Sequence, residues 1–280
     1  MKSLLSVSAL ALTLSSVANA QTVTSLPDLG NCVYNTSFAT GAGNSANVAI
    51  TGAQPRNGNG SLELQMTNFA QPAVSMCGST VTGTLAQLSS LSFDYLGTNP
   101  VNTSPTIRLI FDAQYLGNTR TFNLGWYANS GAPNWTNSGN LTTVGSSIAG
   151  NTGFFLRLTG SGGGQLLRDC STTGLSGGFD DRRQSLTDWL GACNGAAGAL
   201  DFSQAFVKAV QIDQGRWPDF TGTNVNYVDN VTVGYAGRTS SAINFEVAST
   251  VVPEPSTYAL MAAGLAGLFA VQRRRRRQSV

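Results

Sequence analysis

The residues that could carry out acid–base chemistry are carboxylates, because the chain contains fourteen acidic side chains and no histidine. Without histidine, Ser–His–Asp and Cys–His nucleophilic sites are excluded. A glycan hydrolase needs two facing carboxylates, and four aspartates lie in strand-like segments that could meet: Asp94, Asp112, Asp213 and Asp229. Asp94 and Asp112, however, alternate with the apolar residues around them, so we expect both to face solvent. We therefore predict a non-catalytic protein, with glycan hydrolysis as the less favoured alternative.

Cysteine is the second reactive residue type, at Cys32, Cys77, Cys170 and Cys193. An even number of cysteines in an exported chain indicates disulfide bonds, and we favour pairing the first with the second and the third with the fourth. The spacing contains no Cys-x-x-Cys, so we expect no metal and no cofactor. Asp229 beside Asn230 could bind calcium, but Asp229 could equally pair with Arg216 or cap a turn.

Aromatic residues in loop-like surroundings could stack on sugar rings. Trp126, Tyr127 and Trp135 lie in NLGWYANSGAPNWTNSGN, and Trp217 lies in QGRWPDFTG. Neighbouring Asn and Asp side chains could bond sugar hydroxyls. Trp126, Trp135 and Trp217 are therefore possible glycan contacts of a carbohydrate-binding module. The alternative is that these rings only cover the ends of the core, and we favour it for Trp126 and Trp217.

Short segments of alternating apolar and polar residues predict the strands that position these side chains. They include SLELQMT, LSFDYLG, TIRLIFDAQY, GFFLRLTG, FVKAVQIDQG and NYVDNVTVGY, separated by stretches rich in Gly, Asn and Pro. This arrangement predicts an all-β, two-sheet sandwich formed by residues 21–247, followed by a linker at residues 248–251.

One segment follows a helical period instead. In SLTDWLGAC, Leu186, Trp189, Leu190 and Cys193 recur at helical spacing, and Ser185 precedes them as an N-cap with Asp188 three residues on. We expect one short helix, held to the sandwich by the buried ring of Trp189.

The charge of the body excludes nucleic acid as a partner. Between Gln21 and Glu254 there are ten basic and fourteen acidic residues, a net charge of −4. The basic isoelectric point therefore comes from the terminal arginines, and the body has no basic surface for phosphates.

The N-terminus has the layout of a secretory signal peptide. Lys2 is followed by an apolar run from Leu4 to Leu14, and Ala18 and Ala20 are the small residues that signal peptidase requires. We expect residues 1–20 to be removed and the mature chain to begin at Gln21.

The C-terminus has three parts. Pro253, Glu254 and Pro255 form an extended, accessible stretch. An apolar run of 14 residues follows, Tyr258–Val271, about 21 Å long as a helix against a bilayer core of roughly 30 Å. Five arginines, Arg273, Arg274, Arg275, Arg276 and Arg277, come next and favour the cytoplasmic side. With snorkelling arginines extending its reach, we expect this run to be a single membrane-spanning helix.

This order, from Val252 to Arg277, closely resembles the PEP-CTERM sorting signal of Gram-negative bacteria. The resemblance implies recognition of Pro253, Glu254 and Pro255 by the membrane enzyme exosortase, with the arginines as a stop signal. It also implies passage through the inner membrane to the cell surface or extracellular matrix, in association with exopolysaccharide or biofilm.

The body more loosely resembles jelly-roll, carbohydrate-binding-like modules. The resemblance lies in GTLAQLSSLSFDY, PTIRLIFDA, YVDNVTVGY and AINFE. It implies a jelly roll without implying an activity. We therefore predict an exported, non-catalytic envelope or extracellular-matrix protein, with a carbohydrate-binding module as the alternative.

Overall fold

The computed structural model describes residues 19–30, 32, 37–39, 41–97, 104–115, 117–128, 132–143, 153–158, 184–195, 200–214, 221–248 and 260–269. The chain divides into two compact units, Met1–Val247 and Ala248–Val280. Within the described part of the first unit, strands form two large sheets and one small pair, β2 (Phe38–Ala39) with β5 (Ala70–Gln71).

The first large sheet has seven strands, with β14 at its centre. β14 pairs with β4, β8 and β15, all antiparallel, and the edge strand β1 pairs with β15 in parallel. The strands are β1 (Asn19–Val23), β3 (Ser45–Thr51), β4 (Ser61–Thr67), β8 (Leu88–Gly97), β11 (Thr136–Asn137), β14 (Thr223–Tyr235) and β15 (Ser241–Phe245).

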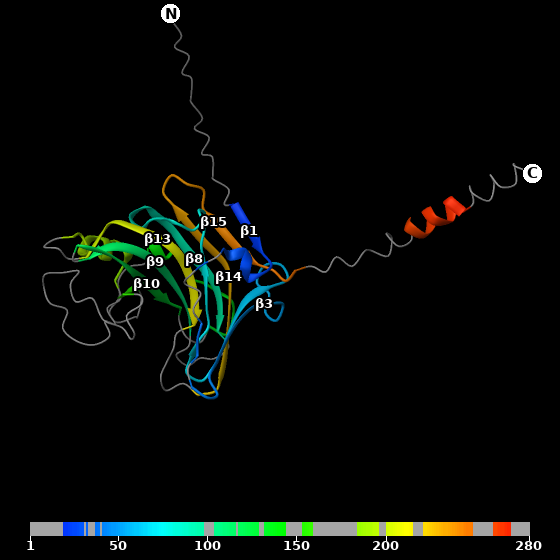
Figure 1. The fold of residues 1–280 in the computed structure, drawn as a ribbon, viewed down its shortest axis with the longest axis horizontal. Helices are drawn as coiled ribbons and strands as arrows, with labels where there is room; N and C mark the ends of the chain where they lie inside the picture. The colour runs from blue at the N-terminus through cyan, green and yellow to red at the C-terminus, as the bar shows by residue number, and fades with distance from the viewer. Residues whose placement is uncertain are drawn as a thin grey trace, which may run out of the picture. The chain divides into compact units, whose positions relative to one another are not determined.

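The second large sheet has six strands and is antiparallel at every pairing. Figure 1 shows β9, β10 and β13 of this sheet in one layer and β8, β14 and β15 in the other. Its strands are β6 (Ala73–Met76), β7 (Gly83–Thr84), β9 (Pro105–Tyr115), β10 (Asn118–Tyr127), β12 (Phe155–Leu158) and β13 (Asp201–Gln214).

The core lies between the two sheets and is formed by the alternate apolar residues that the sequence predicted. Leu62, Leu64 and Met66 of β4 are fully buried, as are Ile107 and Phe111 of β9. The two layers meet directly, because Phe93 of β8 and Trp126 of β10 pack edge to face with ring centroids 5.8 Å apart. The predicted jelly-roll-like two-sheet sandwich is confirmed.

The predicted short helix is also present, as α1 (Leu186–Ala192). Ser185 caps it, because its hydroxyl oxygen accepts the backbone N–H of Asp188 at 3.0 Å. Trp189 is buried, and its indole N–H donates to the carbonyl of Phe154 at 2.8 Å. Single turns of 3-10 helix lie at Leu26–Leu29, Leu85–Gln87 and Leu141–Thr143.

A disulfide joins Cys32 to Cys77, which confirms the first predicted pairing. Cys193 is disulfide-bonded as well. Cys170, the partner predicted for it, lies outside the described residues.

The second unit contains a helix at residues 260–269, whose side chains are exposed. Ten residues of helix span about 15 Å, half of what a bilayer core requires. No helix in the described ranges is long and apolar enough to cross a membrane, so the predicted membrane-spanning helix is not confirmed.

Candidate functional site: the outer face of the six-stranded sheet

The six-stranded sheet has a polar outer face, formed by the alternate residues that point away from the core. In β9 these residues separate the buried Ile107, Leu109 and Phe111, so strand geometry places them on the opposite side. We use "outer face" for these β9 residues and their register partners on β10 and β13: Thr106, Arg108, Ile110, Asp112, Thr121, Asn123, Gly125, Tyr127, Phe206, Ala209, Gln211 and Asp213.

A buried ion pair lies near one end of the outer face. The guanidinium of Arg108 binds the carboxylate of Asp213 through Nε and Nη2, the latter at 3.1 Å, and the two side chains are 7% and 0% exposed. Its Nη1 also donates to Oδ1 of Asn123 at 3.4 Å. Burial alone would lower the pKa of Arg108, but the adjacent carboxylate outweighs burial and raises the pKa above its ordinary value. The guanidinium of Arg108 is therefore charged at any physiological pH.

An aromatic pair lies beside this ion pair. The rings of Tyr127 and Phe155 stack with centroids 4.6 Å apart and planes 17° apart. Phe155 also lies close to Gly125, where an added Cβ would be 2.1 Å from the ring Cζ, and the Arg108 guanidinium is 5.1 Å from the centroid of the Phe155 ring. The glycine thus allows the ring to approach both the sheet and the cation.

Among the described residues of the outer face, one polar side-chain atom at this end has no hydrogen-bond partner. The hydroxyl of Thr106 is fully buried and makes no hydrogen bond, although Thr106 is the register partner of both Tyr127 and Asp213. A buried hydroxyl without a partner costs about 1–3 kcal/mol.

A second, more open ion pair lies at the other end of the outer face. Nζ of Lys208 is 2.7 Å from Oδ2 of Asp112, and the two side chains are 36% and 29% exposed. Oδ1 of Asp112 accepts the hydroxyl of Thr121 at 2.7 Å. The outer face therefore combines paired charges with aromatic rings, which together can bond and stack against sugars.

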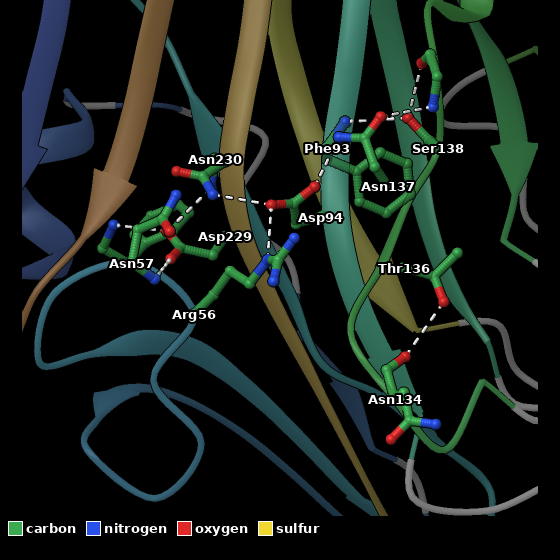
Figure 2. A network of polar contacts seen from close by, with 12 residues as sticks. Arg56, Asn57, Phe93, Asp94, Asn134, Thr136, Asn137, Ser138, Asp229 and Asn230 are labelled. Atoms are coloured by element: carbon green, nitrogen blue, oxygen red, sulfur yellow. Dashed lines mark hydrogen bonds and ion pairs between the residues drawn. The ribbon is translucent and has the colours of Figure 1, made fainter.

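A separate polar network lies on the seven-stranded sheet. Oδ2 of Asp94 accepts from Nε of Arg56 at 3.1 Å and from Nδ2 of Asn230 at 2.8 Å, and its Oδ1 accepts from Asn137 (Figure 2). Asp94 is only 4% exposed, so the expectation that it faces solvent was wrong. The physical reason is that Arg56 and Asn137 cover it.

Asp229 is the second carboxylate of this network, and it is fully buried. Its Oδ1 accepts the backbone N–H groups of Asn230 and Phe245 at 2.8 and 3.0 Å, and its Oδ2 accepts that of Asn57 at 3.4 Å. Burial raises the pKa of Asp229 to about 6, against the effect of these donors, and the charge of Glu246 adds to the rise.

The network has a structural rather than a catalytic arrangement. All four carboxylate oxygens of Asp94 and Asp229 accept hydrogen bonds from the protein. Three carboxylates from three segments hold the loop between β3 and β4, because Glu246 also accepts the N–H of Asn59 at 2.6 Å. Among the residues that the structure describes, no three His, Cys, Asp or Glu form a group that could hold a metal ion.

The structure places the predicted glycan contacts in different environments. Trp126 is 8% exposed and belongs to the core, so its ring offers no open face. Trp135 is half-buried just before β11, away from the outer face, and Trp217 lies outside the described residues. The sequence interpretation named Asp213 only as a possible catalytic carboxylate and did not single out Arg108 or Phe155, although a charged residue between Ile107 and Leu109 was a signal for a polar face.

Most residues predicted to direct processing lie outside the described ranges. These are Ala18, the motif residues Pro253, Glu254 and Pro255, and the arginines 273–277. Ala20 is in β1, where it pairs with Ala242.

Comparison with known proteins identifies the C-terminal segment. Residues 251–276 match the family described as the PEP-CTERM protein-sorting motif, as the sequence predicted. No curated protein matches the chain.

Solved structures similar to this chain include the family 11 carbohydrate-binding module of the cellulosomal cellulase Lic26A-Cel5E of Clostridium thermocellum. The similarity has 13% identity and a TM-score of 0.36, over 78% of this chain and 93% of the module. A second similar structure is the family 11 module from Clostridium thermocellum in complex with a β-1,3-1,4-mixed-linked tetrasaccharide. It has 12% sequence identity and a TM-score of 0.35, over 80% of this chain and 96% of the module. The structure of an exo-β-agarase has 12% sequence identity and a TM-score of 0.28, over 78% of this chain and 26% of the agarase chain.

Proposed function

We propose that this exported protein is a non-catalytic component of the cell surface or extracellular matrix of a Gram-negative bacterium, released to that location by exosortase. The observation that carries the proposal is the sorting motif at residues 251–276. The Cys32–Cys77 disulfide supports it, because such bonds persist in oxidising compartments. Signal peptidase would cut after Ala20, and exosortase would recognise Pro253, Glu254 and Pro255 while the arginines 273–277 act as the stop signal at the inner membrane.

The test is intact-mass and C-terminal peptide mapping of the protein from native cells, with and without exosortase. We expect a mature chain that ends upstream of Tyr258 only when exosortase is present. Replacing both Pro253 and Pro255 by Ala should prevent this processing, and Ser256→Ala serves as the control. A secreted form that keeps Arg277 would refute the proposal.

A second candidate function is polysaccharide binding, and the outer face favours it. Tyr127 supplies a partly exposed ring there, while the partly exposed Lys208 and Asp112 supply polar groups for sugar hydroxyls. Association with exopolysaccharide would also give the exported domain a partner in the matrix.

The binding test is a pull-down with the producing bacterium's own exopolysaccharide. Loss of binding in Tyr127→Ala, but not in Trp135→Ala, would assign binding to the outer face. The reverse result would assign it to the region before β11, and an unbound wild-type domain would remove this candidate.

A further inference from the structure

Phe206 is an unusual residue of the outer face, because its ring is open to solvent. It is 47% exposed, and in the described part of residues 19–247 the one other exposed large apolar side chain is Val247. A single exposed apolar residue is common on protein surfaces and by itself needs no explanation. Two features distinguish Phe206: the backbone that directs it outward, and the polar groups around it.

A β-bulge directs Phe206 outward. Val210 and Ile212 of β13 are fully buried in the core, and regular alternation back along the strand would place Phe206 on the same side. Between Val207 and Ala209 the register shifts, because Val207 pairs with Phe111 and Ala209 with the adjacent Ile110. Lys208 is therefore an extra residue. The shift buries Val207 and exposes Phe206, as bulges near binding sites often do.

The surroundings of Phe206 are hydrogen-bonding groups on the same face. Its register partner on β9 is Asp112, which carries the Lys208 ion pair and accepts the hydroxyl of Thr121. The bulge that exposes the ring thus also supplies, through Lys208, the cation of the adjacent pair. An apolar ring beside a partly exposed donor and acceptor matches a sugar, which has an apolar C–H face and hydroxyls at its edge.

We propose that Phe206, Lys208 and Asp112 form a saccharide subsite that stacks one ring of an uncharged polysaccharide. The inference rests on the proposed binding of polysaccharide to the outer face and adds a second aromatic contact to it. From Thr106 to Asp112 the face extends about 20 Å along β9, so Tyr127 and Phe206 would contact different rings of one polysaccharide chain.

Charge determines the ligand class. The two ion pairs of the outer face, Arg108–Asp213 and Lys208–Asp112, are each internally neutral. The body of the chain carries a net charge of −4, which repels a polyanion. An uncharged glycan meets no such repulsion, and its binding changes little with salt.

The experiment is affinity electrophoresis of the domain in gels that contain the producing bacterium's exopolysaccharide, hydroxyethyl cellulose, galactomannan or alginate. Phe206→Ala removes the stacking ring, Phe206→Tyr keeps it, and Val247→Ala is the control for loss of an exposed apolar side chain. We expect Phe206→Ala to weaken binding to a neutral polymer by about tenfold and the other two variants to bind like wild type.

The outcomes separate this inference from the proposed function. Wild-type binding that Phe206→Ala leaves unchanged would overturn the subsite and keep polysaccharide binding. Binding to alginate alone, abolished by salt, would overturn the neutral ligand class. A wild-type domain that binds no polymer, including the host exopolysaccharide, would overturn both. Thermal unfolding of Phe206→Ala should match wild type, because the ring is exposed.

Discussion

Asp94 and Asp229 are direct register partners on β8 and β14, and both carboxylates are buried. The two carboxylates differ in their partners. Asp94 forms an ion pair with the guanidinium of Arg56, whereas Asp229 accepts hydrogen bonds from neutral backbone N–H groups. Burial, with no cation beside the carboxylate, raises the pKa of Asp229.

The raised pKa predicts a pH-dependent stability that Asp229→Asn removes. The folded state holds the Asp229 proton up to about pH 6, while the unfolded chain loses it at its ordinary pKa near 3.8. Asp229 therefore favours folding below that ordinary value, and its contribution is lost as the pH rises through 6. From about pH 7 to about pH 4.5, wild type should gain on the order of 2 kcal/mol relative to the variant.

Urea unfolding of both proteins at several pH values measures this gain. The neighbouring charged groups Arg56, Asp94 and Glu246 are present in both proteins, so the difference between the two stability curves reports on Asp229. Parallel stability curves for wild type and Asp229→Asn would contradict the prediction.

The loop between β3 and β4 should not tolerate a side chain at Gly60. A Cβ there would lie 2.5 Å from the backbone nitrogen of Val247 and 2.8 Å from Cα of Glu246. Because backbone cannot move aside cheaply, Gly60→Ala should cost about 1–3 kcal/mol of unfolding free energy. Gly52→Ala, in the same loop, is the matched control, since its closest contact would be 3.2 Å. Equal midpoints for the two variants would contradict this account.

Removing the Cys32–Cys77 disulfide should destabilise the domain strongly. The bond closes a sequence separation of 45 residues, for which loop-closure entropy gives about 4 kcal/mol. The double variant Cys32→Ser/Cys77→Ser should therefore unfold at clearly lower urea than wild type. If the double variant unfolded at the same urea concentration as wild type, the surrounding contacts would hold the domain together without the disulfide.

The Arg108–Asp213 pair should show strong coupling in a double-mutant cycle. Arg108→Met or Asp213→Leu alone leaves a buried charge without its partner, which costs about 3–5 kcal/mol. The double variant leaves no unpaired charge, so its loss of unfolding free energy should be much smaller than the sum of the losses in the two single variants. Additive losses, measured by urea unfolding, would indicate that the groups do not depend on each other.

The alternation of apolar residues was sufficient to predict most of the sandwich. It correctly placed Leu62, Leu64 and Met66 in the core, and the period of 3.6 residues located α1 with its Ser185 cap. These features depend on local spacing, which a sequence displays directly.

Register shifts limited that prediction. In NYVDNVTVGY, regular alternation back from Val231 and Val233 would place Tyr227 in the core, but the core contains Val228 instead, because the register shifts between Asp229 and Thr232. Phe206 is exposed for the same kind of reason. A bulge depends on the partner strand, so alternation within one strand cannot reveal it.

The candidate site was predictable only in its polar character. Asp112 was placed correctly on the side of β9 away from the core, and Arg108 lies on the same side, since both alternate with Ile107 and Phe111. The pairing of Arg108 with Asp213 joins residues 105 positions apart and follows from the β9–β13 register. The aromatic candidates came from composition alone, which is why Trp126 was counted although it packs against Phe93.

Strand β1 would impose an order on the predicted cleavage of the signal peptide. It runs from Asn19 to Val23 along β15, so the predicted cut after Ala20 falls inside the strand. A peptide bond in the active site of a peptidase cannot at the same time pair with Ala242 and Ile243. Cleavage would therefore come before this edge of the sheet closes. The new N-terminal end of the chain would then pair with β15 through Gln21, Thr22 and Val23, so this edge of the sheet would form only in the processed protein.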